Sequence, residues 1–142
     1  MRNVKDILNS KGREVWSVGP NDSVLDVLRL MAEKEVGATI VLDGERIAGI
    51  VSERDYARKV ALKGRTSREA RAADIMTSTV VCVRPEQSIE ECMELMTRGR
   101  LRHLPVVDRG KLVGVVSIGD LVKAIIDEQE FTINQLQSYI TG

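Results

Sequence analysis

Two short stretches of the chain carry a serine and an aspartate at the same spacing. GIVSERD places Ser52 three residues before Asp55, and GVVSIGD places Ser117 three residues before Asp120. In each stretch a glycine-bearing run of β-branched residues, typical of a strand, passes directly into a helical pattern. This is the position at which α/β proteins place ligands, and a carboxylate there can accept hydrogen bonds from both hydroxyls of a ribose.

The same spacing also predicts simple helix capping. A serine at the N-cap accepts a hydrogen bond from the amide three residues on, and an acidic side chain at that position bonds back to the cap. Two further helix starts have this form, Ser23 with Asp26 and Ser88 with Glu91. The spacing alone therefore leaves a ligand site and a cap as alternatives.

The two stretches belong to a longer internal repeat. From Val18 onward the chain matches itself at a constant offset of 65 residues. The matched pairs include Pro20 with Pro85, Ser23 with Ser88, Met31 with Met96, Asp43 with Asp108, and Gly49 with Gly114. Two copies at such a period indicate a pair of supersecondary units that share a buried face.

Each copy predicts the same elements. A short extended segment (EVWSV or TVVCVRP) precedes a helix with apolar residues every three or four positions, and a hairpin of two apolar strands follows. The Ser-x-x-Asp stretch then opens a second helix, which Gly64 ends in the first copy. The fold class is α/β (α+β), with the order β-α-β-β-α occurring twice. A separate C-terminal helix is expected from the spacing of Phe131, Ile133, Leu136 and Ile140.

The boundaries that we assign are residues 1–66 for the first repeat, 67–73 for a linker, 74–127 for the second repeat and 128–142 for the C-terminal helical extension. Composition fits a globular protein, with 43% hydrophobic and 30% charged residues. Lys plus Arg and Asp plus Glu each number 21, so no overall charge favours nucleic acid or a membrane surface. No apolar run approaches a membrane span, and we expect a cytoplasmic protein.

The remaining chemistry of the side chains is sparse. Cys82 and Cys92 lie in apolar stretches and are predicted to be buried structural thiols. With one histidine and no closely spaced cysteines, no metal site is expected. We find no nucleophile and base pair and no phosphate-binding loop of the GxxxxGK type, so we predict no catalytic residues, no catalytic cofactor and no enzyme.

Both copies resemble CBS (cystathionine-β-synthase) domains. The resemblance rests on DIL, GATIVLD and GIVSERD in the first copy and on DIM, RHLPVVD and GVVSIGD in the second, and it covers the chain from about Val4 to Asp127. It implies a tandem pair, the Bateman module, whose repeats pack through their sheets around a pseudo-two-fold axis with two ligand clefts. It further implies a homodimer and adenine nucleotide ligands, namely AMP, ADP, ATP or NAD(H), and sometimes S-adenosylmethionine.

Site residues follow from the resemblance. In the first cleft Asp55 would bind the ribose, Ser52 the ribose or the α-phosphate, and Arg54 the phosphate. The opposite copy would close the cleft with Thr79, Val80, Val81, Arg102 and His103. In the second cleft Ser117 and Asp120 take the same roles beside Arg102 and His103, and the opposite copy adds Val15 to Ser17, Gly37 and Ala38. His103 is alternatively a hydrogen-bonded structural residue.

The two copies differ in charge. Arg54 precedes the first aspartate, whereas Gly119 precedes the second, and the strand opening is Arg102-His103 in the second copy but Gly37-Ala38 in the first. We therefore expect the first cleft to prefer ligands with more phosphate and the second to suit AMP or to bind weakly. The predicted function is regulatory: nucleotide binding shifts the module, and an unidentified partner protein responds. One alternative is an interaction module with degenerate clefts that acts through the C-terminal helix and dimer surface. Nucleic-acid binding through the linker arginines is a further alternative, with little support from the net charge.

Overall fold

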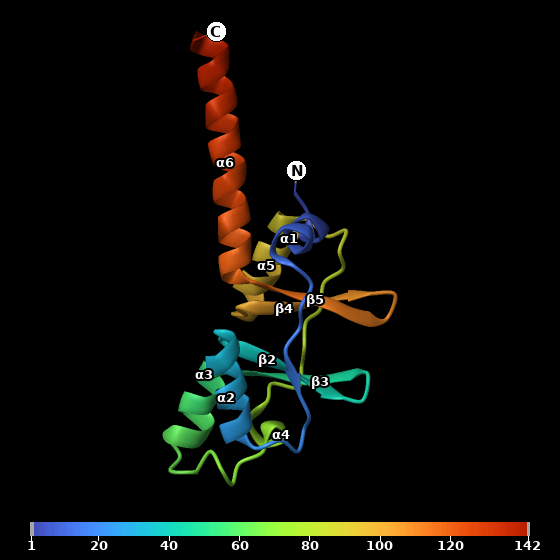
Figure 1. Cartoon of the computed structure of the whole chain (residues 1–142), viewed down its shortest axis with the longest axis vertical. Helices are drawn as coiled ribbons and strands as arrows, with labels where there is room; N and C mark the ends of the chain where they lie inside the picture. Colours follow the sequence, from blue (N-terminus) through green and yellow to red (C-terminus); the bar gives the residue numbers. More distant parts are fainter. Residues whose placement is uncertain (1, 142) are drawn as a thin grey trace. The chain divides into compact units, whose positions relative to one another are not determined.

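The computed structural model describes residues 2–141. The chain forms two compact units: one comprises Val15–Val81, and the other comprises Met1–Glu14 together with Cys82–Gly142. These units differ from the sequence repeats, because the first segment of each repeat packs in the unit of the other repeat. Figure 1 shows the helices and strands along the chain.

The unit of residues 15–81 is built on a three-stranded sheet in the order β1-β2-β3. β1 (Ser17–Val18) runs parallel to β2 (Ala38–Asp43), which pairs antiparallel with β3 (Arg46–Ser52) as the predicted hairpin. α2 (Val24–Lys34) buries Val24, Val27 and Met31 in a core shared with the sheet. Their spacing of three and four residues is the apolar pattern on which the helix was predicted.

After β3 the chain forms α3 (Glu53–Tyr56), the π-helix η1 (Ala57–Ala61) and, further on, α4 (Ala72–Ile75). The predicted regular helix is therefore wrong in part, because the amides of Leu62 and Arg65 bond carbonyls five residues back. The predicted stop at Gly64 is confirmed by its φ of 68°, a conformation that favours glycine.

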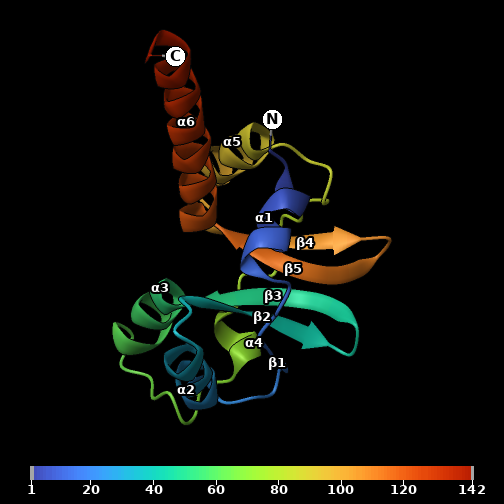
Figure 2. The same cartoon turned by 45° about the horizontal axis from the view of Figure 1, so that its top comes forward.

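Gly49 allows α4 to lie close against β3. A Cβ added at Gly49 would lie 2.7 Å from Met76 Sδ and 2.8 Å from the Thr77 carbonyl oxygen. The Ile50 and Thr77 backbones bond each other in both directions at 3.0 and 2.8 Å. The first segment of the second repeat is thus fixed to the first repeat's hairpin (Figure 2).

The other unit repeats this plan with its own exchanged segment. β4 (His103–Asp108) and β5 (Lys111–Ser117) form the second predicted hairpin, and α5 (Ile89–Gly99) buries Ile89, Cys92 and Met96. α1 (Val4–Lys11) packs on β5, where a Cβ at Gly114 would lie 2.7 Å from Leu8 Cδ2. Backbone bonds from Val4 to Gln87 and from Lys5 to Pro85 hold α1 in this unit.

The predicted extended segments before α2 and α5 are shorter than expected. EVWSV forms only the two residues of β1, and TVVCVRP forms only a parallel bridge between Val83 and Val106. Val83 is buried and its neighbour Cys82 is exposed, as alternation along an extended chain requires. The prediction of a buried thiol is therefore confirmed for Cys92 and wrong for Cys82.

The C-terminal helix is present but is not a separate element. α6 (Ile118–Thr141) continues without a break from the Ser117 junction for 24 residues. No glycine or proline occurs between Asp120 and Thr141 to interrupt it, so the predicted boundary at residue 128 is absent from the helix. In Figures 1 and 2, α6 lies beside α5 near its start and then extends beyond the rest of its unit.

No helix within residues 2–141 combines the length and the apolar composition needed to cross a membrane.

Candidate functional site

Each Ser-x-x-Asp stretch forms a complete capping box where a strand enters a helix. The Asp55 amide donates to Ser52 Oγ at 3.1 Å, and the Ser52 amide and hydroxyl donate to Asp55 Oδ2 at 2.9 and 3.0 Å. In the other unit the Asp120 amide donates to Ser117 Oγ at 3.1 Å, and the Ser117 amide donates to Asp120 Oδ2 at 2.8 Å. The capping interpretation is confirmed, and capping does not prevent the same side chains from binding a ligand.

Burial distinguishes these two boxes from the others. The Asp55 and Asp120 side chains are 15% and 23% exposed, whereas the side chain of Asp26, three residues after the Ser23 cap, is 62% exposed. Glu91, in the Ser88 box, is also exposed. A carboxylate that is largely withdrawn from water costs free energy unless a charge or several donors compensate it.

A lysine supplies that compensation in each unit. Lys59 Nζ lies 3.3 Å from Asp55 Oδ1 and donates to the Ile75 carbonyl oxygen at 2.9 Å. Lys11 Nζ lies 2.7 Å from Asp120 Oδ2 and donates to the Val115 carbonyl oxygen at 2.9 Å. Each site therefore pairs one carboxylate with one ammonium group that is anchored by a backbone carbonyl.

The two lysines do not occupy equivalent positions in the repeat. At the 65-residue offset, Lys59 corresponds to Ala124, which is buried. Lys11 comes from α1, which reaches Asp120 only because α1 packs in the unit of the second repeat. Both residues were missing from the sequence prediction; Lys59 could have been found as an i, i+4 partner of Asp55, but Lys11 had no comparable local signal.

The first residues of β2 and β4, which the repeat predicts to be equivalent, lie at the same position in their two hairpins. Ala38 pairs with Ser52, and His103 pairs with Ser117. The Gly37 carbonyl accepts from the Glu53 amide at 3.1 Å, and the Arg102 carbonyl accepts from the Ile118 amide at 2.9 Å. Each opening thus lies beside the serine of its own unit.

The predicted site residues divide between the units as follows. One unit contains Val15, Ser17, Gly37, Ala38, Ser52, Arg54, Asp55, Thr79, Val80 and Val81, and the other contains Arg102, His103, Ser117 and Asp120. Arg54 is exposed on α3, and Arg102 is exposed just before β4. The contributions predicted to cross from one repeat to the other stay predictions, as does the two-fold relation of the repeats.

The electrostatics are best defined around Asp120. Burial alone would raise the pKa of its carboxyl group, but hydrogen bonds from Lys11 and Ser117 and the charge of Lys11 outweigh burial and lower it. Burial lowers the pKa of His103. The positive charges of Lys11 and Arg102 lower it further, and the negative charge of Asp120 opposes them. At neutral pH the site therefore holds a carboxylate and a neutral imidazole beside two cationic side chains.

Hydrogen-bonding capacity remains at both sites. An ammonium group has three donors; Lys11 makes two hydrogen bonds, and Lys59 makes one besides its ion pair with Asp55. Among the described residues, Asp120 Oδ1 accepts no hydrogen bond. The arrangement can therefore accept from hydroxyls and donate to an anionic group. No cluster of three or more His, Cys, Asp or Glu side chains within residues 2–141 could hold a metal ion.

Comparison with known proteins agrees with the repeat. The CBS domain model matches residues 4–62 and again residues 72–127. The chain belongs to the CBS-domain family. The family includes signal-transduction and regulatory proteins, and the tandem CBS pair expected from the sequence is confirmed.

Similar proteins come from several organisms. The mitochondrial CBS domain-containing protein CBSX3 of Arabidopsis thaliana is 36% identical, over 98% of this chain and 72% of its own length. A CBS-domain protein of Burkholderia ambifaria, whose name assigns it to signal transduction, has a TM-score of 0.88 and 55% identity over 90% of this chain and 96% of its own. A hexameric CBS-CP12 protein from bloom-forming cyanobacteria has a TM-score of 0.77 and 30% identity over 86% of this chain and 70% of its own.

Proposed function

We propose that this CBS-domain protein is a regulatory module that binds adenine nucleotides, AMP, ADP, ATP or NAD(H), at its two Ser-Asp boxes. One observation carries the proposal: in both units a largely buried carboxylate lies beside an anchored lysine where a strand enters a helix. Capping does not require the lysine, because the box of Ser88 and Glu91 forms without one.

The carboxylates would bind the ribose. Asp55 accepts from Ser52 through Oδ2 and meets Lys59 through Oδ1, so the lone pairs that remain can accept from the two ribose hydroxyls. Asp120 offers Oδ1 in the same way. Because vicinal hydroxyls are paired donors at fixed spacing, a carboxylate matches them better than a single acceptor does.

The cationic side chains would bind the phosphates. Arg54 lies on α3 with Asp55, and Lys59 lies on η1, which follows it. In the other unit Lys11 pairs with Asp120, and Arg102 lies next to His103. Each unit thus supplies two cations of its own. The expected preference of the first site for more phosphate then depends on Arg102 and His103 contributing to it across the repeats.

Regulation would follow from unequal affinity. A nucleotide can shift an equilibrium between two arrangements only to the extent that it binds one of them more tightly. With no catalytic role assigned to the chain, the readout is proposed to be a partner protein or a change in association with further copies of the chain. The homodimer implied by the resemblance is part of this proposal.

The test is isothermal titration calorimetry of protein freed of bound ligand, with AMP, ATP, NAD⁺ and NADH. We expect micromolar binding, with one site lost in Asp55→Ala and the other in Asp120→Ala. Glu91→Ala is the matched control, because it removes the acidic member of a capping box outside the proposed sites. Equal loss in all three variants, or no binding by the unaltered protein, would refute nucleotide binding at these boxes.

A second function is favoured by the exposed apolar residues of α6. The chain would then act as an interaction module, and its two boxes would serve as caps only. In that case the chain still binds its partner after Asp55 and Asp120 are both changed to alanine. If partner binding depends on nucleotide, the same double change abolishes it.

A further inference from the structure

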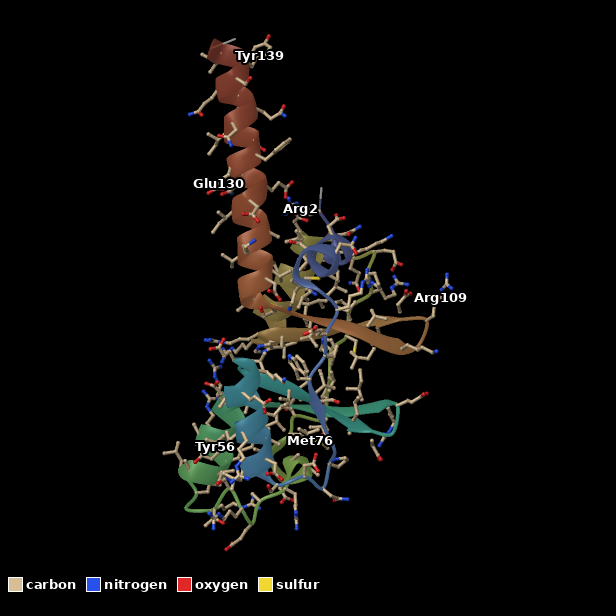
Figure 3. All side chains as sticks on the ribbon, viewed as in Figure 1. Arg2, Tyr56, Met76, Arg109, Glu130 and Tyr139 are labelled. Carbon is tan, nitrogen blue, oxygen red and sulfur yellow. The ribbon has the colours of Figure 1, made fainter. Side chains whose placement is uncertain are left out.

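Apolar side chains that its own unit leaves exposed occur on α6 from its second turn to its C-terminal end. Val122, Ile126, Ile133, Leu136 and Ile140 are 42%, 47%, 53%, 57% and 80% exposed. Figure 3 shows the labelled side chains of Glu130 and Tyr139 projecting from the second half of the helix, with no other element of the unit beside them.

These five exposed residues form one narrow stripe, whereas Phe131 and Tyr139, which are also exposed, lie outside it. With Gln129 the five occupy positions 122, 126, 129, 133, 136 and 140, which alternate in steps of four and three. Such spacing is the a and d pattern of a heptad, with Ile126, Ile133 and Ile140 at a. At 1.5 Å per residue the stripe is about 27 Å long.

The stripe is distinct from the face that α6 uses within its unit. Leu121 and Ala124 are buried, and α6 contacts α5, β5 and α1 through its first turns. At 100° per residue these two positions point well away from the line through Val122 and Ile126. The helix therefore has one face for its own unit and another that lacks a cover.

We propose that the stripe of a second copy of this chain covers this one, as a parallel two-stranded coiled coil in register. β-Branched isoleucine at a with leucine at d favours two parallel strands, and here isoleucine occupies all three a positions and leucine one of the three d positions. From Gln129 to Ile140 the only charged residue is Glu130, at an e position, and its partner at g in a parallel pair is Ile125. No like charges therefore face each other along this part of the seam.

Gln129 selects the parallel register. In a parallel pair the two Gln129 side chains meet at the same d layer, where each amide can donate to and accept from the other. In the antiparallel pairing that keeps most of the stripe aligned, Gln129 faces Ile133 and its amide is buried without a partner, at a cost in free energy. A single polar core residue of this kind fixes register in coiled coils.

The first measurement is disulfide trapping in full-length protein carrying Cys82→Ser, which removes the exposed native thiol. Leu136→Cys, at a d position that meets its own copy only in the parallel pair, is expected to form a covalent dimer under mild oxidation. Ser138→Cys, on the opposite side of α6, is the matched control and is expected to cross-link at least tenfold more slowly. Equal rates, or no cross-link at Leu136→Cys, would overturn the parallel pairing.

The second measurement is sedimentation of Ile133→Glu across micromolar concentrations. We expect at least a tenfold weaker association than for the unaltered protein, because the change buries two carboxylates in the seam. Asn134→Glu adds the same charge outside the stripe and is expected to leave association unchanged. If Ile133→Glu associates as the unaltered protein does, or if the stripe binds only a different protein, the proposal fails.

Discussion

Thr39 offers a direct test of the packing beneath the first site. Its side chain is 2% exposed, and Oγ1 has no hydrogen-bond partner among the described residues. Thr39 pairs with Val51 on β3 and lies on the same face of β2 as Val41, both of which belong to the buried apolar cluster. Thr39→Val replaces the hydroxyl with a methyl group of nearly the same size.

The magnitude follows from the lost hydration of the hydroxyl. A buried polar group without a partner costs about 1–3 kcal/mol, and valine removes that cost while it adds apolar contact. We expect Thr39→Val to raise the free energy of unfolding by about 1–2 kcal/mol, which corresponds to an increase in Tm of about 3–6 °C. Calorimetry and urea unfolding at constant protein concentration measure both quantities.

The control keeps the hydroxyl and removes the methyl group. Thr39→Ser retains the buried Oγ1 and opens a small void, so it is expected to lower stability by about 1 kcal/mol. If Thr39→Val instead destabilises the protein, the hydroxyl has a partner, such as a buried water, and the packing argument is wrong.

Two further predictions concern close packing and pH. Gly49→Ala is expected to lower the free energy of unfolding by about 2–3 kcal/mol, because its Cβ meets a backbone oxygen. Gly114→Ala is expected to lower it by about 1 kcal/mol, because its Cβ meets the end of a flexible leucine side chain. Urea unfolding measures both, and equal losses would contradict the packing argument. Burial keeps the pKa of His103 below its ordinary value, so the folded state binds fewer protons than the unfolded state. Its contribution to stability is therefore present above pH 6.5, the ordinary value, and is lost as the pH falls from there through the folded pKa. His103→Gln is expected to flatten that part of the stability curve, and an unchanged slope would refute the assignment.

The sequence predicted the elements that depend on local pattern. The two hairpins follow from alternating apolar runs around short turns, and α2 and α5 follow from apolar residues every three or four positions. The caps at Ser52 and Ser117 were also recognisable, because a capping box is confined to four residues. In each case the information lies within a few residues of the element.

The exchange of α1 and α4 between the repeats could not be predicted in the same way. It depends on contacts such as those of Leu8 with Gly114 and Met76 with Gly49, which join residues far apart or across the predicted linker. The linker boundary at residues 67–73 was drawn from composition, which carries no information on packing. Lys11 was overlooked for this reason, since its distance from Asp120 is set by the exchange.

The two sites contain the same pair of groups, a carboxylate and an ammonium group, but the lysine comes from a different part of the repeat in each. In one unit Lys59 approaches Asp55 from the π-helix that follows it, and in the other Lys11 approaches Asp120 from α1. Where one unit has Lys59, the other has the buried Ala124, so sequence identity between the repeats does not account for the shared carboxylate and ammonium pair.

This difference makes the lysines informative in their own right. If the aspartates serve only as caps, removing either lysine alters a partly exposed ion pair and little else. If they bind nucleotides, Lys11→Met weakens binding at the Asp120 site alone and Lys59→Met at the Asp55 site alone, as separate steps in calorimetry. Because both changes leave the serine and aspartate bonds in place, they separate a binding role from the capping role that the two functions share.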